Sequence, residues 1–202
     1  DDRDALEAEK KKLKVDYLLD DSRDLLDESL DGAARVKAIV QNLKTFSRLD
    51  QENEHEADIN ECLENTINIA WNELKYKVTL EKEYGSLSQL LCYPQKLNQV
   101  FLNILVNASQ AIEDSGIIKV RTWEADASIF VEISDTGCGI PEDKLSRIFE
   151  PFYTTKEVGK GTGLGMSISF EIIKEHGGEI QVASVVGEGT TFTIRLPLSK
   201  ID

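Results

Sequence analysis

The chain has 202 residues, enough for one medium-sized domain and an appendage, and its 37 acidic against 23 basic residues give a formal net charge of −14 at pH 7. Such a charge argues against nucleic acid or an anionic membrane as the main partner, and no apolar run approaches the ~20 residues needed to cross a bilayer. The cysteines lack disulfide or metal spacing and no signal peptide is present, so we expect a cytoplasmic location without direct membrane contact from this segment, even if a longer parent protein is membrane-attached.

Residues 1–50 have a helical pattern, because they contain no proline, one glycine and apolar residues at helical spacing. Between positions 26 and 46 the apolar residues advance by threes and fours and form one continuous stripe. A helix striped in this way must pack against other helices, although a surface helix on the following domain would give the same pattern. Residues 51–59 are polar and predict a linker to a second domain over 60–202.

The second domain alternates helical and strand patterns. We expect a helix capped by Asn60, strands at 77–84 and 87–93, a helix starting at Pro94, a hairpin of 117–123 with 128–134, a helix that ends at His176, and strands at 179–184 and 190–196. This order predicts an α+β fold, a two-layer sandwich with helices on one face of a mixed sheet.

Two glycine clusters lie in the most informative stretch of the chain. The first, at 135–140, follows a strand pattern, and the second, at 159–165, runs directly into a helical pattern. A glycine-rich loop that opens a helix aims backbone N–H groups at an anion. The second cluster therefore predicts a phosphate cradle. The first predicts a close wall for a flat ring, with Asp135 accepting a hydrogen bond and glycines leaving room for the ring.

Common nucleotide-binding motifs do not explain these glycines. A Walker loop requires a Gly-Lys pair followed by Ser or Thr, and no glycine here stands in that register. A dinucleotide fingerprint requires a strand directly before the glycine turn, whereas a long polar loop precedes Gly159. A mobile linker would have a similar glycine content, so the interpretation depends on the neighbouring motifs.

Three more motifs complete an ordered set. Asn103 and Asn107 lie on one face of a predicted helix, the aromatic segment 148–156 separates the glycine clusters, and a Gly-Glu-Gly-Thr-Thr-Phe motif at 187–192 precedes the last strand. In order, the five motifs resemble the N, G1, F, G2 and G3 boxes of the ATP-binding domain of sensor histidine kinases, in the superfamily of gyrase, Hsp90 and MutL. The resemblance implies the same two-layer α/β sandwich and the use of ATP with Mg²⁺.

By this resemblance, Asp135 accepts a hydrogen bond from the adenine amino group, and Asn107 ligates Mg²⁺ together with phosphate oxygens and waters. The catalytic residues implied are Asn103 and Asn107. Gln110 stands where many relatives have a phosphate-binding Lys or Arg, so we name Lys156, as a third catalytic residue, and Lys160 as the substitute cations. The other nucleotide-binding residues implied are Gly137, Gly139, Ile140, Phe149, Lys160, Gly161, Thr162, Gly163, Leu164, Gly165 and Thr190. Each type also has a structural explanation: a turn-capping Asp, surface asparagines, solvated lysines or packed phenylalanines.

The resemblance also covers the helical region. Residues 28–47 resemble the second helix of the dimerisation and phosphotransfer hairpin, which makes residues 1–50 a partial dimerisation region and implies a homodimer. The chain has two histidines, His55 in the polar linker and His176 at a helix end, and neither precedes the bundle helix. We therefore expect no phosphoacceptor in this chain and no autophosphorylation by it alone.

The function implied is that of a protein-histidine kinase, which transfers the ATP γ-phosphoryl group to a histidine on the dimerisation helix for relay to an aspartate of a response-regulator receiver domain. The alternatives are a nucleotide-switched, non-catalytic interaction module and a gyrase- or Hsp90-type ATPase. Many gyrase-like relatives have a water-activating glutamate at the position of Asn103, and an amide cannot accept a proton in that way. This substitution disfavours the ATPase.

Overall fold

The computed structural model describes residues 53–156 and 161–198, with a few positions between 14 and 32. The chain divides into two compact units: Asp1–Ser47 with Lys156–Thr162, and Arg48–Thr155 with Gly163–Asp202. Most of the apolar stripe predicted between positions 26 and 46 lies outside the described residues. Two of its members that are described, Leu26 and Leu30, are helical and exposed. Within the described part, no helix is both long and apolar enough to span a membrane.

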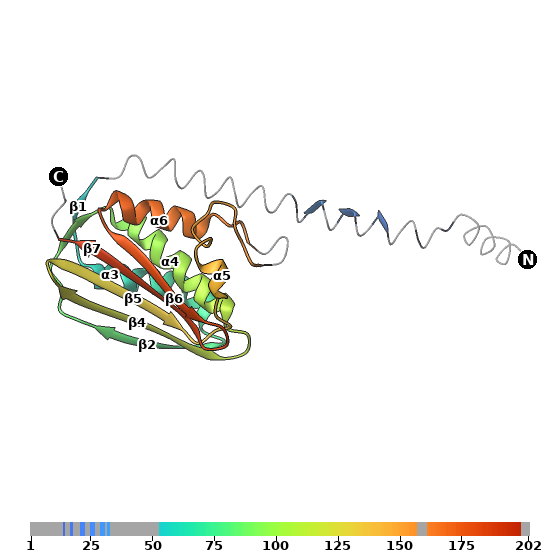
Figure 1. Cartoon of the computed structure of the whole chain (residues 1–202), viewed down its shortest axis with the longest axis horizontal. Coiled ribbons are helices and arrows are strands. Elements are labelled where there is room, and N and C mark those ends of the chain that lie inside the picture. Colours follow the sequence, from blue (N-terminus) through green and yellow to red (C-terminus); the bar gives the residue numbers. More distant parts are fainter. Residues whose placement is uncertain are drawn as a thin grey trace, which may run out of the picture. The chain divides into compact units, whose positions relative to one another are not determined.

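The larger unit is built on a five-stranded mixed sheet with helices on one face (Figure 1). The strands, in spatial order, are β2 (Val78–Tyr84), β4 (Gly116–Ala125), β5 (Ser128–Asp135), β7 (Gly189–Pro197) and β6 (Glu179–Val185). Strands β2 and β4 are parallel, and the other neighbours are antiparallel. The helices are α3 (Ile59–Leu74), α4 (Pro94–Ala111), the one-turn α5 (Glu142–Leu145) and α6 (Gly165–Glu175). This architecture confirms the predicted two-layer fold.

The hydrophobic core lies between the sheet and the helices. Alternate residues of β5, including Val131 and Ile133, are buried, as expected when one face of a strand packs on helices. Helix α4 lies between α3 and α6 and buries an apolar stripe that includes Phe101 and Ile104. Because each such side chain contributes about 1.5–3 kcal/mol when fully buried, α4 is anchored along most of its length. It is therefore a rigid support for the two asparagines that it carries.

Several local predictions are confirmed. Pro94 is the first residue of α4, and the β4–β5 hairpin turns through Asp126 and Ala127, whose φ angles are 49° and 52°. Helix α6 ends at His176, where Gly177 has a φ of +66°. The signals for these features lie within a few residues of each feature, which is why sequence reasoning found them.

Two local features differ from the sequence-based expectation. Asp58, not Asn60, caps α3, because its Oδ1 accepts the N–H groups of Asn60 and Glu61 at 2.8 and 3.4 Å. The side chain of Asn60 instead links α3 to the sheet. Its Nδ2 donates to Gly85 O at 3.0 Å, and its Oδ1 accepts from the Thr122 hydroxyl at 2.8 Å.

The polar segment predicted as a linker contains a short strand. β1 (His55–Ala57) pairs antiparallel with β3 (Leu90–Cys92), which is shorter than the strand predicted at 87–93. His55 and Glu56 are polar and exposed and gave no strand signal, because the pairing depends on the backbone of a segment more than 30 residues away. The larger unit therefore contains the chain immediately before α3.

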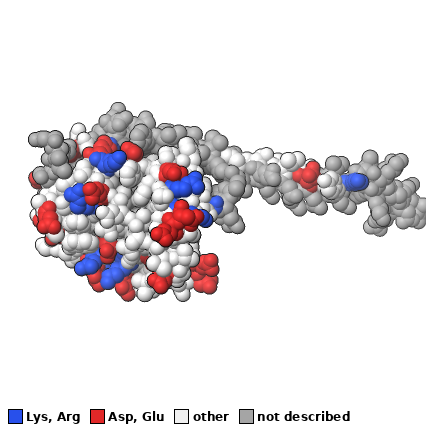
Figure 2. All heavy atoms as spheres, in the orientation of Figure 1, with Lys and Arg blue, Asp and Glu red and all other residues white. Residues whose placement is uncertain are grey.

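Charged side chains of both signs lie close to one another on the face of the larger unit seen in Figure 2. Surface ion pairs join Lys119 to Glu83 at 2.7 Å and Arg195 to Glu179 at 3.2 Å. Exposed pairs of this kind contribute only about 0–1 kcal/mol each. The stability of the unit therefore rests on its apolar core.

Candidate functional site

Asp135 lies at the end of β5, at the base of the first glycine loop. Its side chain is almost fully buried, and its Oδ1 accepts a hydrogen bond from the N–H of Gly137 at 2.8 Å. Burial raises the pKa of this carboxyl, and hydrogen bonds from the backbone of Gly137 and Thr190 oppose that rise. A carboxylate kept buried by backbone donors is costly for the fold, and such groups gather at functional sites.

The glycines of the first loop are required by contacts with the protein backbone. A Cβ on Gly137 would lie 2.7 Å from the carbonyl carbon and oxygen of Ala111, at the end of α4. Gly139 has a φ of +71°, and a Cβ there would collide with the carbonyl of Val185. The sequence suggested that these glycines leave room for a ring. The structure shows a second reason for them. Even without a ligand, a side chain at Gly137 would collide with the end of α4, and one at Gly139 would collide with the β6–β7 turn.

Ser184, which the sequence reasoning missed, connects the first glycine loop to the last. Its Oγ accepts the N–H of Ile140 at 2.7 Å and donates to Gly189 O at 2.8 Å. Its Oγ also lies 2.9 Å from the hydroxyl of Thr190. Since the single hydrogen of Ser184 goes to Gly189, the Thr190 hydroxyl must be the donor in that contact. Ser184 thereby fixes the positions of Ile140 and Thr190, two predicted nucleotide-binding residues, relative to each other.

The two asparagines lie one turn apart on α4, and the structure shows what the first contacts. Asn103 Nδ2 donates to Gly165 O at 3.0 Å and to Ser169 Oγ at 3.2 Å. Ser169 is fully buried and donates to the same carbonyl at 2.8 Å. Asn103 therefore ties α4 to the first turn of α6. Asn107 is half-buried one turn further along α4.

The aromatic segment meets the second glycine cluster at a strained residue. Phe152 has a φ of +66° although it is not glycine, and conformations of this kind cost about 1–3 kcal/mol and cluster at functional sites. Gly163 also has a φ of +66°, and a Cβ on it would collide with the backbone of Phe152. Phe149 packs against Phe170 of α6, with ring centroids 5.3 Å apart. Phe149 and Phe152 thus tie the aromatic segment to α6 and to the glycine before it.

The N-terminus of α6 suits an anion. The cap position is Leu164, whose side chain cannot accept a hydrogen bond from the first turn, and Gly165 is the first helical residue. Backbone N–H groups at such a position, with the helix dipole, favour negative charge. This geometry agrees with the phosphate cradle predicted from the glycines.

The larger unit contains most of the predicted site residues. These are the catalytic candidates Asn103 and Asn107 and the nucleotide-binding candidates Asp135, Gly137, Gly139, Ile140, Phe149, Gly163, Leu164, Gly165 and Thr190. Lys156, Gly161 and Thr162 belong to the other unit, and Lys160 lies outside the described residues. The roles of all these residues stay predictions.

Residues 92–200, more than half of the chain, match the family described as histidine kinase-, DNA gyrase B-, and HSP90-like ATPase. The chain is 38% identical over 167 residues to the signal transduction histidine-protein kinase AtoS of Escherichia coli (strain K12), an alignment that covers 81% of this chain and 27% of AtoS. It is 49% identical over 110 residues to sporulation kinase E of Bacillus subtilis (strain 168), covering 54% of this chain and 15% of that kinase. The chain thus spans about a quarter or less of the length of these curated relatives.

Solved structures of histidine kinases are also similar to this chain. The catalytic domain of histidine kinase ThkA superposes with a TM-score of 0.65 at 29% identity, covering 72% of this chain and 98% of that domain. The mycobacterial sensor histidine kinase MprB superposes with a TM-score of 0.65 at 25% identity, covering 71% of this chain and 97% of that structure. Sequence and fold therefore point to the same group of proteins.

Proposed function

Because this chain belongs to the histidine kinase-, DNA gyrase B- and HSP90-like ATPase family, and is the ATP-binding catalytic domain of a sensor histidine kinase, we propose that it binds ATP with Mg²⁺ and supplies the γ-phosphoryl group to a histidine. The observation that carries the proposal is the buried carboxylate of Asp135 beside the first glycine loop. The activity of the whole parent kinase, its homodimer and its receiver-domain partner are part of this proposal.

Adenine fits the acceptor that Asp135 offers. Burial raises the pKa of this carboxyl, and hydrogen bonds from two backbone N–H groups lower it. These main-chain donors hold the buried acceptor in place. A carboxylate has about four acceptor positions, so the backbone N–H groups of Gly137 and Thr190 leave capacity for an exocyclic amino group. Ile140 and Thr190, linked through Ser184, would border the same base.

The start of α6 suits the phosphates of the nucleotide. Asn107 can supply one ligand to Mg²⁺, and the phosphates would have to supply others. Among the described residues, no group of three His, Cys, Asp or Glu side chains could hold a metal ion. Mg²⁺ is commonly held by one or two protein oxygens and by substrate phosphates and waters, which agrees with a single amide ligand from Asn107. When bound, the ion would neutralise charge on the phosphates.

Asn103 favours phosphoryl transfer over hydrolysis. Its amide cannot act as a general base, and its Nδ2 is engaged by Gly165 and Ser169. An attacking group that is itself nucleophilic, such as an imidazole, does not require that base. We therefore place the γ-phosphoryl acceptor on a histidine outside the ATP-binding domain.

The two histidines of the chain are poor acceptors. His176 is buried, its Nδ1 donates to Ile172 O at 2.7 Å, and its Nε2 accepts the N–H of Tyr93 at 3.1 Å. Both ring nitrogens are therefore occupied. His55 lies in the short strand β1, not on a helix.

Incubation with radiolabelled ATP and Mg²⁺ tests the proposal, with and without an added dimerisation hairpin from a sensor-kinase relative that carries an acceptor histidine. We expect label on the added hairpin and none on this chain, by mass spectrometry under conditions that preserve phosphohistidine. Stoichiometric phosphate on His55 or His176 would overturn the acceptor assignment. ATP binding in calorimetry without label on any acceptor would identify a non-catalytic nucleotide module, and absence of ATP binding would overturn the whole proposal.

A further inference from the structure

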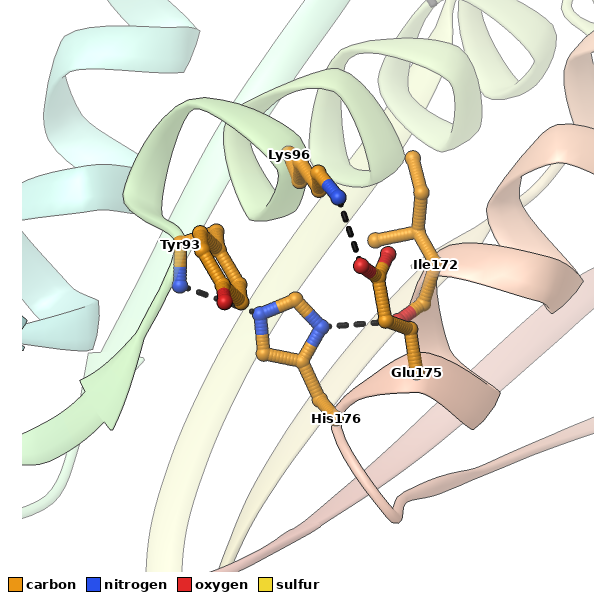
Figure 3. Close-up of polar contacts among 5 residues, drawn as sticks. All are labelled: Tyr93, Lys96, Ile172, Glu175 and His176. Atoms are coloured by element: carbon orange, nitrogen blue, oxygen red, sulfur yellow. Dashed lines mark hydrogen bonds and ion pairs between the residues drawn. The ribbon is translucent and has the colours of Figure 1, made fainter. Parts of the chain in front are cut away.

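A cluster of polar side chains joins the start of α4 to the end of α6, at the opposite end of α6 from the glycine loop (Figure 3). We call Tyr93, Lys96, Glu175 and His176 the helix clasp. Lys96 Nζ lies 2.6 Å from Glu175 Oε1, and the rings of Tyr93 and His176 meet edge to face with centroids 5.7 Å apart. Figure 3 shows the imidazole of His176 between the backbone of Tyr93 and the carbonyl of Ile172.

The partners of His176 require one protonation state. A carbonyl can only accept, so Nδ1 must carry the hydrogen that points to Ile172 O; a backbone N–H can only donate, so Nε2 must be bare toward Tyr93. A protonated ring would place two donors against each other at Tyr93. The clasp is therefore complete only with a neutral imidazole.

Burial makes these contacts costly to lose. Both Lys96 and His176 are buried, and an unpaired buried polar group costs about 1–3 kcal/mol. Burial lowers the pKa of His176; the hydrogen bond to Ile172 and the carboxylates of Glu175 and Glu54 act in the opposite direction, and Lys96 adds to the lowering. His176 also lines a cavity of ≈ 180 Å³, together with Glu54 and Leu90.

Helix α6 is thus attached to α4 at both ends by polar contacts. Asn103 holds the first turn through Gly165 and Ser169, and the clasp holds the last turn through Lys96 with Glu175 and through Tyr93 with His176. The helix has 11 residues, about 16 Å at 1.5 Å per residue. A helix attached at both ends has a fixed direction. One attached at the start alone can tilt about that attachment, and the tilt turns the N–H groups of its first turn away from the direction of a bound phosphate.

We propose that His176 is a positioning residue for nucleotide binding: its neutral imidazole, with the Lys96–Glu175 pair, aligns α6 on α4 so that the glycine-rich start of α6 meets the phosphates. This role rests on the proposed function, because it presumes a nucleotide at that helix start. It predicts a specific pattern. Loss of the clasp weakens binding of ADP, whose phosphates meet α6, and spares adenosine, which Asp135 reads from β5.

Two substitutions of His176 separate its two hydrogen bonds. His176→Gln places an amide oxygen near the position of Nε2 and keeps an acceptor for the N–H of Tyr93. His176→Asn places its amide nitrogen near Nδ1 and keeps only the donor to Ile172. At about pH 7.5 we expect Gln to bind ADP within about twofold of wild type and Asn about tenfold more weakly, with adenosine affinity of both unchanged.

A second pair of variants tests the clasp without touching the imidazole. Glu175→Gln removes the negative charge that faces Lys96 but keeps an acceptor oxygen, and Glu171→Gln makes the same change on an exposed residue one turn earlier on α6. We expect about threefold weaker ADP binding for the first and no change for the second. If His176→Asn fails to fold in a thermal melt, this pair and the pH profile below decide the proposal.

The pH profile supplies a readout that packing alone would not move. The folded pKa of His176 is lowered from 6.5, so the clasp is intact above that pH and is lost as the pH falls through the folded pKa. As the pH is lowered below 6.5 and passes through the folded pKa of His176, the ADP-to-adenosine affinity ratio of wild type should fall below that of His176→Gln, while protonation of the nucleotide affects both proteins alike.

The outcomes separate the two hypotheses. A wild-type chain that binds neither ADP nor adenosine in calorimetry overturns the proposed function and the clasp with it. A wild type that binds ADP overturns the clasp alone if folded His176→Asn binds ADP as wild type does, if ADP and adenosine weaken in parallel, or if wild type and His176→Gln have identical pH profiles.

Discussion

Substitution of Asp135 by Asn isolates one hydrogen bond of the nucleotide site. The carboxylate accepts hydrogen bonds from the backbone of Gly137, at Oδ1, and of Thr190, and we assign a further acceptor position to the adenine amino group. An Asn side chain has one acceptor oxygen and one NH₂ group. In one rotamer the NH₂ faces the adenine amino group, and in the other it faces the N–H of Gly137. Either way one hydrogen bond is lost and two donors oppose each other.

The expected loss follows from the charge of the acceptor. Hydrogen bonds to charged groups contribute about 1.5–3 kcal/mol, which corresponds to a loss of about 10- to 150-fold in nucleotide affinity. The free energy of unfolding, in contrast, should not fall in this variant. Burial raises the folded pKa of Asp135 above 3.8, so its contribution to stability is present below that pH and is lost as the pH rises through the folded pKa. At neutral pH the ionised group therefore costs stability, and Asn should not lower the free energy of unfolding.

Calorimetry with ADP and Mg²⁺, together with urea unfolding at neutral pH, measures both quantities. Asp126→Asn is the matched control, because Asp126 is exposed in the β4–β5 turn at a positive φ that Asn also tolerates. Unchanged ADP affinity in Asp135→Asn would refute the assignment of this residue. Weaker binding with a large drop in unfolding free energy would make Asp135 a structural residue instead.

Two further substitutions test the metal and the missed serine. Asn107→Ala should reduce the Mg²⁺-dependent part of ADP affinity more than the metal-free part, and equal losses in calorimetry with and without Mg²⁺ would indicate a structural role. Ser184→Ala leaves the N–H of Ile140 without its acceptor, so we expect the free energy of unfolding to fall by about 1–3 kcal/mol and ADP to bind more weakly. The exposed Ser86→Ala is its control in urea unfolding, and equal stabilities of the two variants would contradict the linking role of Ser184.

The sequence by itself determined the main helices and the central strands of the larger unit, their order and the family to which the chain belongs. The alternation of apolar residues along β5, the helical spacing along α4, Pro94 at the start of that helix and Gly177 after α6 are local signals, because each reflects the backbone geometry of its own segment. The five motifs also lie within short stretches. Their order along the chain was enough to indicate the family, and the family match at residues 92–200 confirms it.

Tertiary structure decided which side chains meet across the fold. Asn60 is a reasonable cap by sequence, yet it bonds to Gly85 and Thr122, 25 and 62 positions away, and leaves the cap to Asp58. Ser184 reaches Ile140 over 44 positions, and His176 reaches Tyr93 over 83. Local propensity carries no record of such pairs, because a side-chain hydrogen bond depends on where two separate segments are brought together by the core. The residues that chemistry uses could be recognised in the sequence, whereas the contacts that hold those residues in place arise only when the helices pack on the sheet.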